Sequence, residues 1–214
     1  MSTSPSAPPH ANRVPQPRRP ALVGVDQPRI EAAVAEILAA IGEDPGRAGL
    51  ESTPQRVASA YADFFAGLGQ DPLDHLRDTV PVGDRTGELV LLRDIEFRSV
   101  CEHHLLPFLG TAHLAYLPGE RIVGLGKLAN VVETLAARPQ LQERLTEEIA
   151  DALETGLAPR GILVVLDASH GCVTTRGPRQ TRSSTVTMAS RGDLALPVAR
   201  SEIIALIGGT QVVR

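Results

Sequence analysis

Apolar residues near the start of the chain recur every three or four positions, which is the spacing of an amphipathic helix. One such stretch covers residues 27–41, and Gly42 is expected to end it. A second helix should begin after Ser52 or Thr53, since either side chain can cap it, and should end near Gly67. The first part of the chain is therefore predicted to be helical.

From residue 88 onward, short runs of β-branched and alternating residues replace the helical period. The preceding stretch, residues 69–87, is predicted to be loop. Strands are predicted at residues 88–98, 111–117, 161–168 and 182–189. Helices are predicted at residues 127–137, from Pro139 to Gly156, and at residues 194–207. Antiparallel strands segregated from helices indicate the α+β class.

These patterns divide the chain into three parts. Residues 1–24 are rich in Pro, Ser and Ala and predict a disordered tail, because they offer too little apolar surface to fold. Residues 25–87 form the predicted helical region. Residues 88–214 carry the strands and the polar motifs, so we expect the catalytic domain there.

Composition excludes several functional classes. The chain has 214 residues, of which 43% are hydrophobic and 3% aromatic, so its core should be aliphatic. A net charge of -4 gives no electrostatic reason to expect a nucleic-acid partner. No apolar run approaches the ~20 residues of a membrane span, and the N-terminus lacks the apolar segment of a secretory signal. We therefore expect a cytoplasmic protein with no membrane partner.

The chain has two cysteines, and each is close to histidine. Cys101 is followed by Glu102, His103 and His104, and Cys172 follows His170 by two positions. Thiolate and imidazole are the ligands that zinc favours, and three protein ligands leave a fourth position open for water. The alternatives are a disulfide, which is uncommon in a chain without an export signal, or two inert core thiols, which would not explain the histidines.

A zinc site of this kind could be structural or catalytic. Two cysteines and two histidines would suffice for a structural ion, although such sites usually contain closely paired cysteines, which this chain lacks. In a catalytic site, His103 and His170 would be suited to proton transfer, because imidazole titrates near neutral pH.

Two basic segments and one acidic residue complete the polar pattern. Lys127 follows a glycine-bearing turn at the start of a predicted helix, where backbone N–H groups favour phosphate. Arg176 follows Cys172 by four residues and could hold an oxyanion through two hydrogen bonds. Glu143 could accept two N–H bonds from a guanine edge. Taken alone, the turn before Lys127 is typical of a helix cap, and Arg176 and Glu143 are typical of a solvated surface.

Together these motifs resemble GTP cyclohydrolase I. The resemblance rests on four segments, in the family's order and with compatible gaps: Ser99 to His104, Gly124 to Lys127, Arg138 to Thr146 and His170 to Gly177. It extends to Thr53-Pro54-Gln55-Arg56 in the helical part and covers residues 27–207. No single segment is specific, but the combination is.

The resemblance implies a T-fold, an antiparallel sheet with two packed helices, preceded by N-terminal helices and assembled into a toroidal homodecamer. It implies zinc bound by Cys101, His104 and Cys172, and hydrolysis of GTP at guanine C8. The imidazole ring then opens, formate leaves, and rearrangement yields 7,8-dihydroneopterin triphosphate.

The same resemblance implies roles for the remaining polar residues. His103 and His170 match the proton-transferring histidines, and Glu143 with Gln142 matches the guanine anchor. Lys127, Arg176 and Arg56 match the groups that hold the triphosphate or ribose, with Arg56 supplied by a neighbouring subunit.

The chain departs from the family pattern at two positions. Gly126 and Asn130 stand where the family usually has serine and arginine, both of which contribute to phosphate binding. Arg179 or Arg182 could compensate. The departures keep open a divergent T-fold paralogue that acts on a related purine or pterin nucleotide in a specialised pathway. A nitrile-reducing relative and a non-enzymatic nucleotide-binding oligomer fit less well, because neither needs this combination of zinc ligands and histidines.

Overall fold

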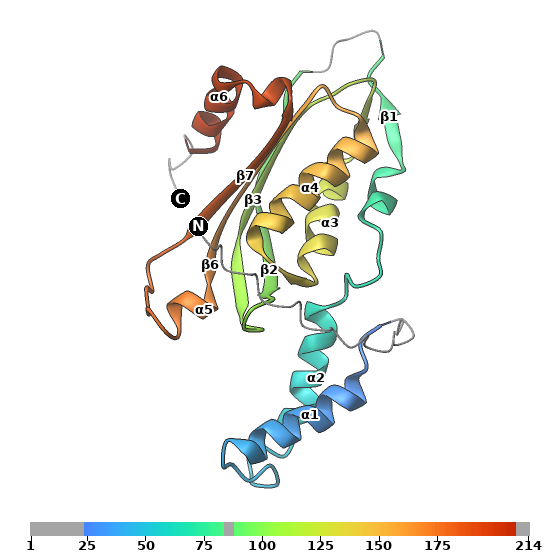
Figure 1. Ribbon diagram of the computed structural model, residues 1–214. Helices are drawn as coiled ribbons and strands as arrows, with labels where there is room; N and C mark the ends of the chain where they lie inside the picture. Colours follow the sequence, from blue (N-terminus) through green and yellow to red (C-terminus); the bar gives the residue numbers. More distant parts are fainter. Residues whose placement is uncertain (1–23, 84–87, 209–214) are drawn as a thin grey trace, which may run out of the picture.

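A five-stranded sheet with helices on both faces forms the centre of the computed structural model, which describes residues 24–83 and 88–208 (Figure 1). The strand order is β5-β2-β3-β6-β7, and every neighbouring pair is antiparallel except β5 and β2. The strands are β2 (Val90–Cys101), β3 (Pro107–Leu117), β5 (Pro139–Gln140), β6 (Gly161–His170) and β7 (Thr185–Gly192). The α+β prediction is confirmed.

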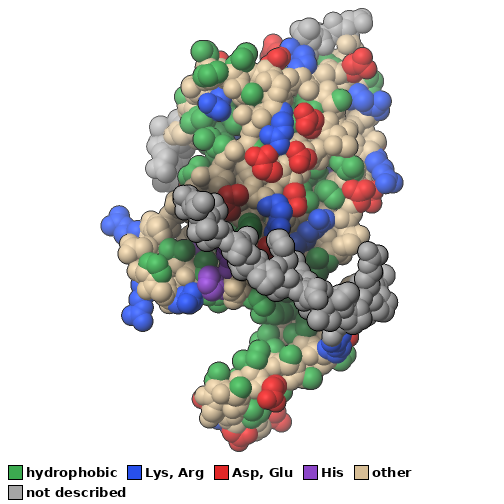
Figure 2. Space-filling model, viewed as in Figure 1, with side chains coloured by type: hydrophobic (Ala, Val, Ile, Leu, Met, Phe, Trp, Pro, Cys, Tyr) green, Lys and Arg blue, Asp and Glu red, His purple; other side chains and the backbone are tan. Residues whose placement is uncertain are grey.

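Two helices, α3 (Leu125–Ala136) and α4 (Gln142–Leu157), cover one face of the sheet (Figure 1). They do so because α4 is amphipathic: Leu145, Ile149 and Leu153 are fully buried at successive turns. Figure 2 shows acidic and basic side chains mixed on the outer face of the molecule over α4. Arg191 of β7 donates to the carboxylates of Glu147 and Asp151 on this helix. The main core therefore lies between this helix pair and the sheet.

The opposite face of the sheet carries a smaller apolar cluster. It joins Leu163 and Val165 of β6 to the C-terminal elements η2 (Asp193–Ala195) and α6 (Pro197–Gly208). The predicted closing helix at residues 194–207 is thus a short 3-10 turn followed by an α-helix. No helix in residues 24–83 or 88–208 has the length and apolar character needed to cross a membrane.

The N-terminal helices α1 (Gln27–Ala40) and α2 (Thr53–Phe64) pack on each other and project away from the sheet (Figure 1). No residue of α1 is buried. Ile37 of this helix is 58% exposed, and Ile41, the residue directly after the helix, is 69% exposed. Both predicted helices are confirmed. The predicted disordered tail, residues 1–24, lies almost wholly outside the described residues.

Three local predictions were wrong in detail. Pro139 does not begin α4 but belongs to β5, where it pairs with the end of β2. Gly156 does not end α4: the helix continues to Leu157, and Ala158 follows in the left-handed conformation. A Cβ at Gly156 would overlap the side chain of Leu76, so the glycine serves packing. The predicted loop at residues 69–87 contains η1 (Pro72–Leu76) and β1 (Thr79–Pro81), which pairs with β4 (Arg121–Val123).

Candidate functional site

The two cysteines come together because of the strand order. β2 and β6 both lie beside β3 and both run antiparallel to it, so their C-terminal ends lie at the same edge of the sheet. β2 ends at Cys101, and β6 ends at His170, two residues before Cys172 in the short helix α5 (Gly171–Thr174). Cys101 and Cys172, about 70 positions apart in the sequence, therefore meet at one edge of the sheet. No local sequence period predicts this contact.

A tight turn after β2 brings His104 to the same place. The N–H of Leu105 donates to the carbonyl of Cys101 at 2.9 Å, and the N–H of Cys101 donates to the carbonyl of Leu106 at 2.9 Å. Leu105 has a φ of 53°, in the left-handed region, which lets the chain reverse within a few residues.

The three predicted ligands form a cluster that could hold a metal ion. Ligand atoms of Cys101, His104 and Cys172 all lie within 4.8 Å of one another. Two sulfurs and one imidazole nitrogen suit a borderline-soft cation, and three ligands leave one position open. The cluster matches the sequence prediction residue for residue.

The thiol of Cys172 lies in an environment that disfavours its ionised form. Burial raises the pKa of Cys172, the neighbouring Cys101 raises it further, and the guanidinium of Arg176 opposes both effects. A bound cation reverses this balance, because a coordinating thiol is deprotonated.

His170 is held between an aromatic ring and an amide. Its ring stacks on Phe108 of β3 with centroids 4.7 Å apart and planes 5° from parallel. Its Nε2 lies 2.7 Å from Oε1 of Gln142, the first residue of α4. Burial lowers the pKa of His170, and the carboxylate of Glu143 opposes that shift. The ring is thus fixed in position and lies near Glu143.

Gln142 is almost completely buried, with 1% of its surface exposed. Its Nε2 has three acceptors for its two hydrogens: the carbonyl of Thr185 at 2.8 Å, that of Leu166 at 3.2 Å, and Oγ1 of Thr187 at 3.1 Å. The amide therefore has no unused hydrogen-bonding group on the nitrogen side. Sequence reasoning missed Thr187 and Phe108, because strand alternation marks their positions only as sheet residues.

His103 is exposed at the tip of the turn, with its ring centroid 6.2 Å from that of His104. Glu102, which precedes His103, is held by hydrogen bonds to β5 and to α4. The N–H of Glu102 donates to the carbonyl of Gln140 at 3.0 Å, and its carboxylate accepts a hydrogen bond from Arg144 of α4. Both histidines therefore extend from a turn that β5 and α4 hold in place.

The predicted substrate-binding residues are only partly gathered in this chain. Glu143 is exposed in the first turn of α4, Lys127 is half-buried in the first turn of α3, and Arg176 is exposed just after α5. Arg56 is exposed on α2, in the projecting hairpin. Its side chain makes no hydrogen bond or ion pair with any described residue, so the single chain does not join it to the metal cluster.

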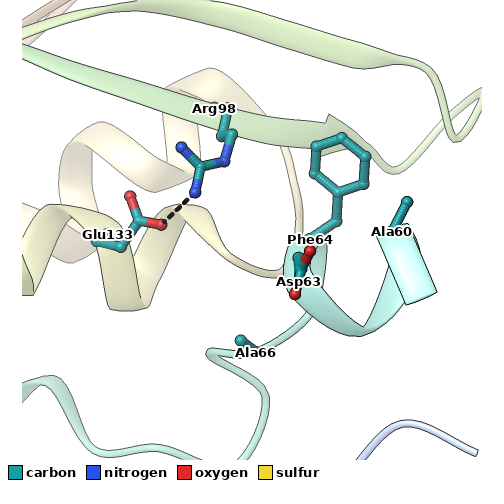
Figure 3. A pocket seen from close by; sticks show the side chains of 6 residues that line it. All are labelled: Ala60, Asp63, Phe64, Ala66, Arg98 and Glu133. Carbon is teal, nitrogen blue, oxygen red and sulfur yellow. Dashed lines mark hydrogen bonds and ion pairs between the residues drawn. The ribbon is translucent and has the colours of Figure 1, made fainter.

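A separate cavity of about 500 Å³ lies where α2 meets β2 and α3 (Figure 3). Phe64 and the ion pair between Arg98 and Glu133, 3.3 Å long, contribute to its lining. None of its lining residues is a predicted site residue, so we assign it no part in the chemistry.

Comparison with known proteins gives a consistent result. Residues 30–208 match the family model described as GTP cyclohydrolase I. The chain is 64% identical to GTP cyclohydrolase 1 of Leifsonia xyli over 187 residues, which is 87% of this chain and 98% of that protein. It is 55% identical to GTP cyclohydrolase 1 of Carboxydothermus hydrogenoformans over 186 residues, 86% of this chain and 96% of that protein.

Proposed function

Because the chain belongs to the GTP cyclohydrolase I family, we propose that Cys101, His104 and Cys172 bind zinc in an enzyme that hydrolyses GTP at guanine C8. The identity of 64% over nearly the whole length of a relative supports GTP cyclohydrolase I activity for this chain. The observation that carries the metal site is the convergence of two sulfurs and one imidazole within 4.8 Å.

The reaction opens the imidazole ring of guanine, releases formate and, after rearrangement of the ribose, yields 7,8-dihydroneopterin triphosphate. Zinc, when bound, supplies the Lewis acidity that makes water nucleophilic near neutral pH. The chain's own residues must bind the substrate, orient it and move protons to the leaving nitrogens.

His103 and His170 are the proposed proton-transfer groups. Both lie beside the metal ligands without belonging to the ligand cluster. His103 is exposed at the turn and free to follow the substrate, whereas His170 is fixed by Phe108 and Gln142. Two imidazoles in such different settings are suited to donating and accepting protons at different steps.

Glu143 is the proposed guanine anchor. It is exposed in the first turn of α4, close enough to His170 to influence its pKa. An ionised carboxylate accepts two parallel N–H bonds, which matches the edge of guanine. Gln142, which the resemblance pairs with Glu143, already uses its side-chain amide within the protein.

Lys127, Arg176 and Arg56 are proposed to hold the triphosphate and ribose. Lys127 and Arg176 extend from the same chain as the metal ligands, and Arg56 comes from the neighbouring subunit of a toroidal homodecamer. The exposed, unpaired Arg56 and the absence of buried residues in α1 support this, because a second copy would cover them.

The same proposal covers the domain division and location. Residues 25–87 are assigned to the helical region that meets the neighbouring subunit, and residues 88–214 to the T-fold catalytic domain. A cytoplasmic location follows from the nucleotide substrate. Gly126 and Asn130 are the basis of the second candidate, a paralogue with an altered nucleotide substrate; the identity to proteins named GTP cyclohydrolase 1 favours the first.

Metal analysis tests the proposed site. The purified protein should contain one zinc per chain, and Cys172→Ser should lose both the zinc and the turnover of GTP. Ser201→Ala, on α6, is the control, because its hydroxyl bonds only the nearby Pro197 carbonyl and it should keep both. A Cys172→Ser protein that retains full zinc would contradict the ligand assignment.

A further inference from the structure

The orientation of the buried Gln142 amide is fixed by its neighbours. Two backbone carbonyls, those of Leu166 and Thr185, lie 3.2 and 2.8 Å from one end of the amide. Carbonyl oxygens only accept hydrogen bonds, so this end must be the NH₂ group. The opposite end, which faces His170, is therefore the oxygen.

Two threonine hydroxyls reinforce the same orientation. Thr146 donates its hydroxyl proton to the backbone carbonyl of Gln142 at 2.8 Å. Thr187 must therefore be the donor in the 2.6 Å bond between the two threonine hydroxyls. The oxygen of Thr187 is then left as an acceptor for the Gln142 amide at 3.1 Å. Flipping the amide would set its oxygen against two carbonyls, which would leave buried groups unsatisfied.

This orientation determines which nitrogen of His170 carries a proton. Because Oε1 of Gln142 only accepts, Nε2 of His170 must donate across the 2.7 Å contact. In the neutral ring, the unprotonated nitrogen is then Nδ1. No described residue hydrogen-bonds to Nδ1, so this nitrogen keeps its lone pair unused within the described part of the chain.

We propose that Gln142 is a positioning residue, which holds His170 in the Nε2–H tautomer so that Nδ1 is the atom that exchanges protons with the substrate. The proposal rests on the proton-transfer role proposed for His170. It assigns the Gln142 side chain to the histidine and not to guanine. Stacking on Phe108 keeps the ring in the plane that this hydrogen bond requires.

The amide suits this task because it is neutral. When Nδ1 accepts a proton, the imidazolium keeps its Nε2–H bond to Gln142, and no proton moves to the amide. The ring thus returns to the same tautomer after each transfer. Loss of the amide should slow the proton-transfer steps and leave GTP affinity nearly unchanged, since Gln142 is 1% exposed.

Two measurements test the proposal. The first is the ¹⁵N spectrum of histidine-labelled, zinc-loaded protein without GTP, in which the His170 signals report the tautomer independently of turnover. The Nε2–H form is expected. A predominant Nδ1–H form would overturn the proposal, whether or not the protein acts on GTP.

The second measurement compares kcat and KM for GTP in Gln142→Leu and Thr187→Val, with zinc content checked in each. Gln142→Leu should lower kcat by about 10²- to 10³-fold, the range for a misplaced acid–base group, with KM changed less than threefold. Thr187→Val removes one support of the amide and should lower kcat by a smaller factor, while the His170 signals keep the Nε2–H form, because the carbonyls of Leu166 and Thr185 still orient the amide.

Thr134→Val is the matched control, because it removes a threonine hydroxyl that contacts another histidine, His75, at 2.9 Å outside the site. It should leave kcat, KM and the His170 signals unchanged. A raised KM with unchanged kcat in Gln142→Leu would show that Gln142 binds the substrate directly and would overturn the proposal.

Discussion

Arg144 of α4 hydrogen-bonds the carboxylate of Glu102, the residue between the proposed metal ligand Cys101 and His103. The same guanidinium donates from Nε to Oε1 of Gln140 at 3.1 Å. The turn that carries the proposed ligands is therefore tied to the helix that carries Glu143. The proposed metal site and the proposed guanine site therefore share Arg144 as a support.

Replacing Arg144 by methionine should weaken zinc binding two- to fivefold. The effect is small because the two side chains are 43% and 37% exposed, and an exposed ion pair contributes about 1 kcal/mol or less. Competition with a chromophoric chelator measures it. Arg98→Met, which breaks an exposed ion pair with Glu133 instead, is the control and should leave zinc affinity unchanged.

His103→Ala should leave zinc bound and lower kcat by about 10²- to 10⁴-fold, the contribution of a positioned acid–base group. His103 is exposed at the tip of the turn and is not one of the three clustered ligands, so its removal should not disturb the metal. Zinc content and steady-state kinetics together check this. Unchanged turnover would contradict the role given to His103.

Gly110→Ala should destabilise the protein by about 3 kcal/mol or more. A Cβ at this position in β3 would overlap the carbonyl oxygen of Asp167 in β6, so the two strands that align the site would separate. Thermal unfolding measures the loss. Gly126→Ala is the matched control: open space surrounds that glycine, and alanine favours the helix by up to about 1 kcal/mol. Equal melting temperatures for the two variants would refute this account.

His113 of β3 is a buried histidine that should make stability depend on pH. It is 8% exposed, and its Nδ1 accepts a hydrogen bond from the backbone N–H of Asp94 at 3.2 Å. Burial lowers the pKa of His113 and Arg93 lowers it further, while the carboxylates of Asp94 and Asp167 oppose the shift. The folded protein therefore favours the neutral ring.

The sign of the effect follows from this shift. The unfolded chain binds a proton at His113 below about pH 6.5, whereas the folded chain resists it. The stability contributed by the neutral ring is fully present above that pH and is lost as the pH falls through the folded pKa. Urea unfolding should show a decline of at most about 1.4 kcal/mol per pH unit, absent from His113→Gln. A wild-type protein that gains stability over this range relative to the variant would contradict the assignment.

Asn130→Arg should lower KM for GTP by about tenfold or more. The family usually has arginine here, Asn130 is exposed on α3 one turn after Lys127, and a charged hydrogen bond contributes about 1.5–3 kcal/mol. Steady-state kinetics at fixed ionic strength measure it, with Asn130→Gln as the uncharged control. An unchanged KM would indicate that another cation, such as Arg179 or Arg182, already fills this position.

Sequence reasoning predicted the elements whose residues carry a clear period. The helix that became α4 was found from Leu145, Ile149 and Leu153, which the structure buries completely. The clustering of Cys101, His104 and Cys172 could be anticipated because sulfur and imidazole are scarce in this chain and chemically distinctive. That these residues meet in space was harder to predict from the sequence, since it depends on β2 and β6 lying on either side of β3.

The supports of the site could not be predicted from local patterns. Thr187 and Thr146 look like ordinary strand and helix residues, yet they determine the orientation of the Gln142 amide. Gly156 looks like a helix stop, but the side chain of Leu76 occupies the space beside it. Such roles arise from contacts between segments far apart in the sequence, and the hydrophobic periodicity of a segment does not reveal them.

The most direct test of the central claim is product analysis after incubation of the purified, zinc-loaded protein with GTP. The account predicts equal amounts of formate and 7,8-dihydroneopterin triphosphate, both lost when a chelator removes the metal and both restored by zinc. Absence of formate and of a pterin chromophore from a protein that contains one zinc per chain would contradict it.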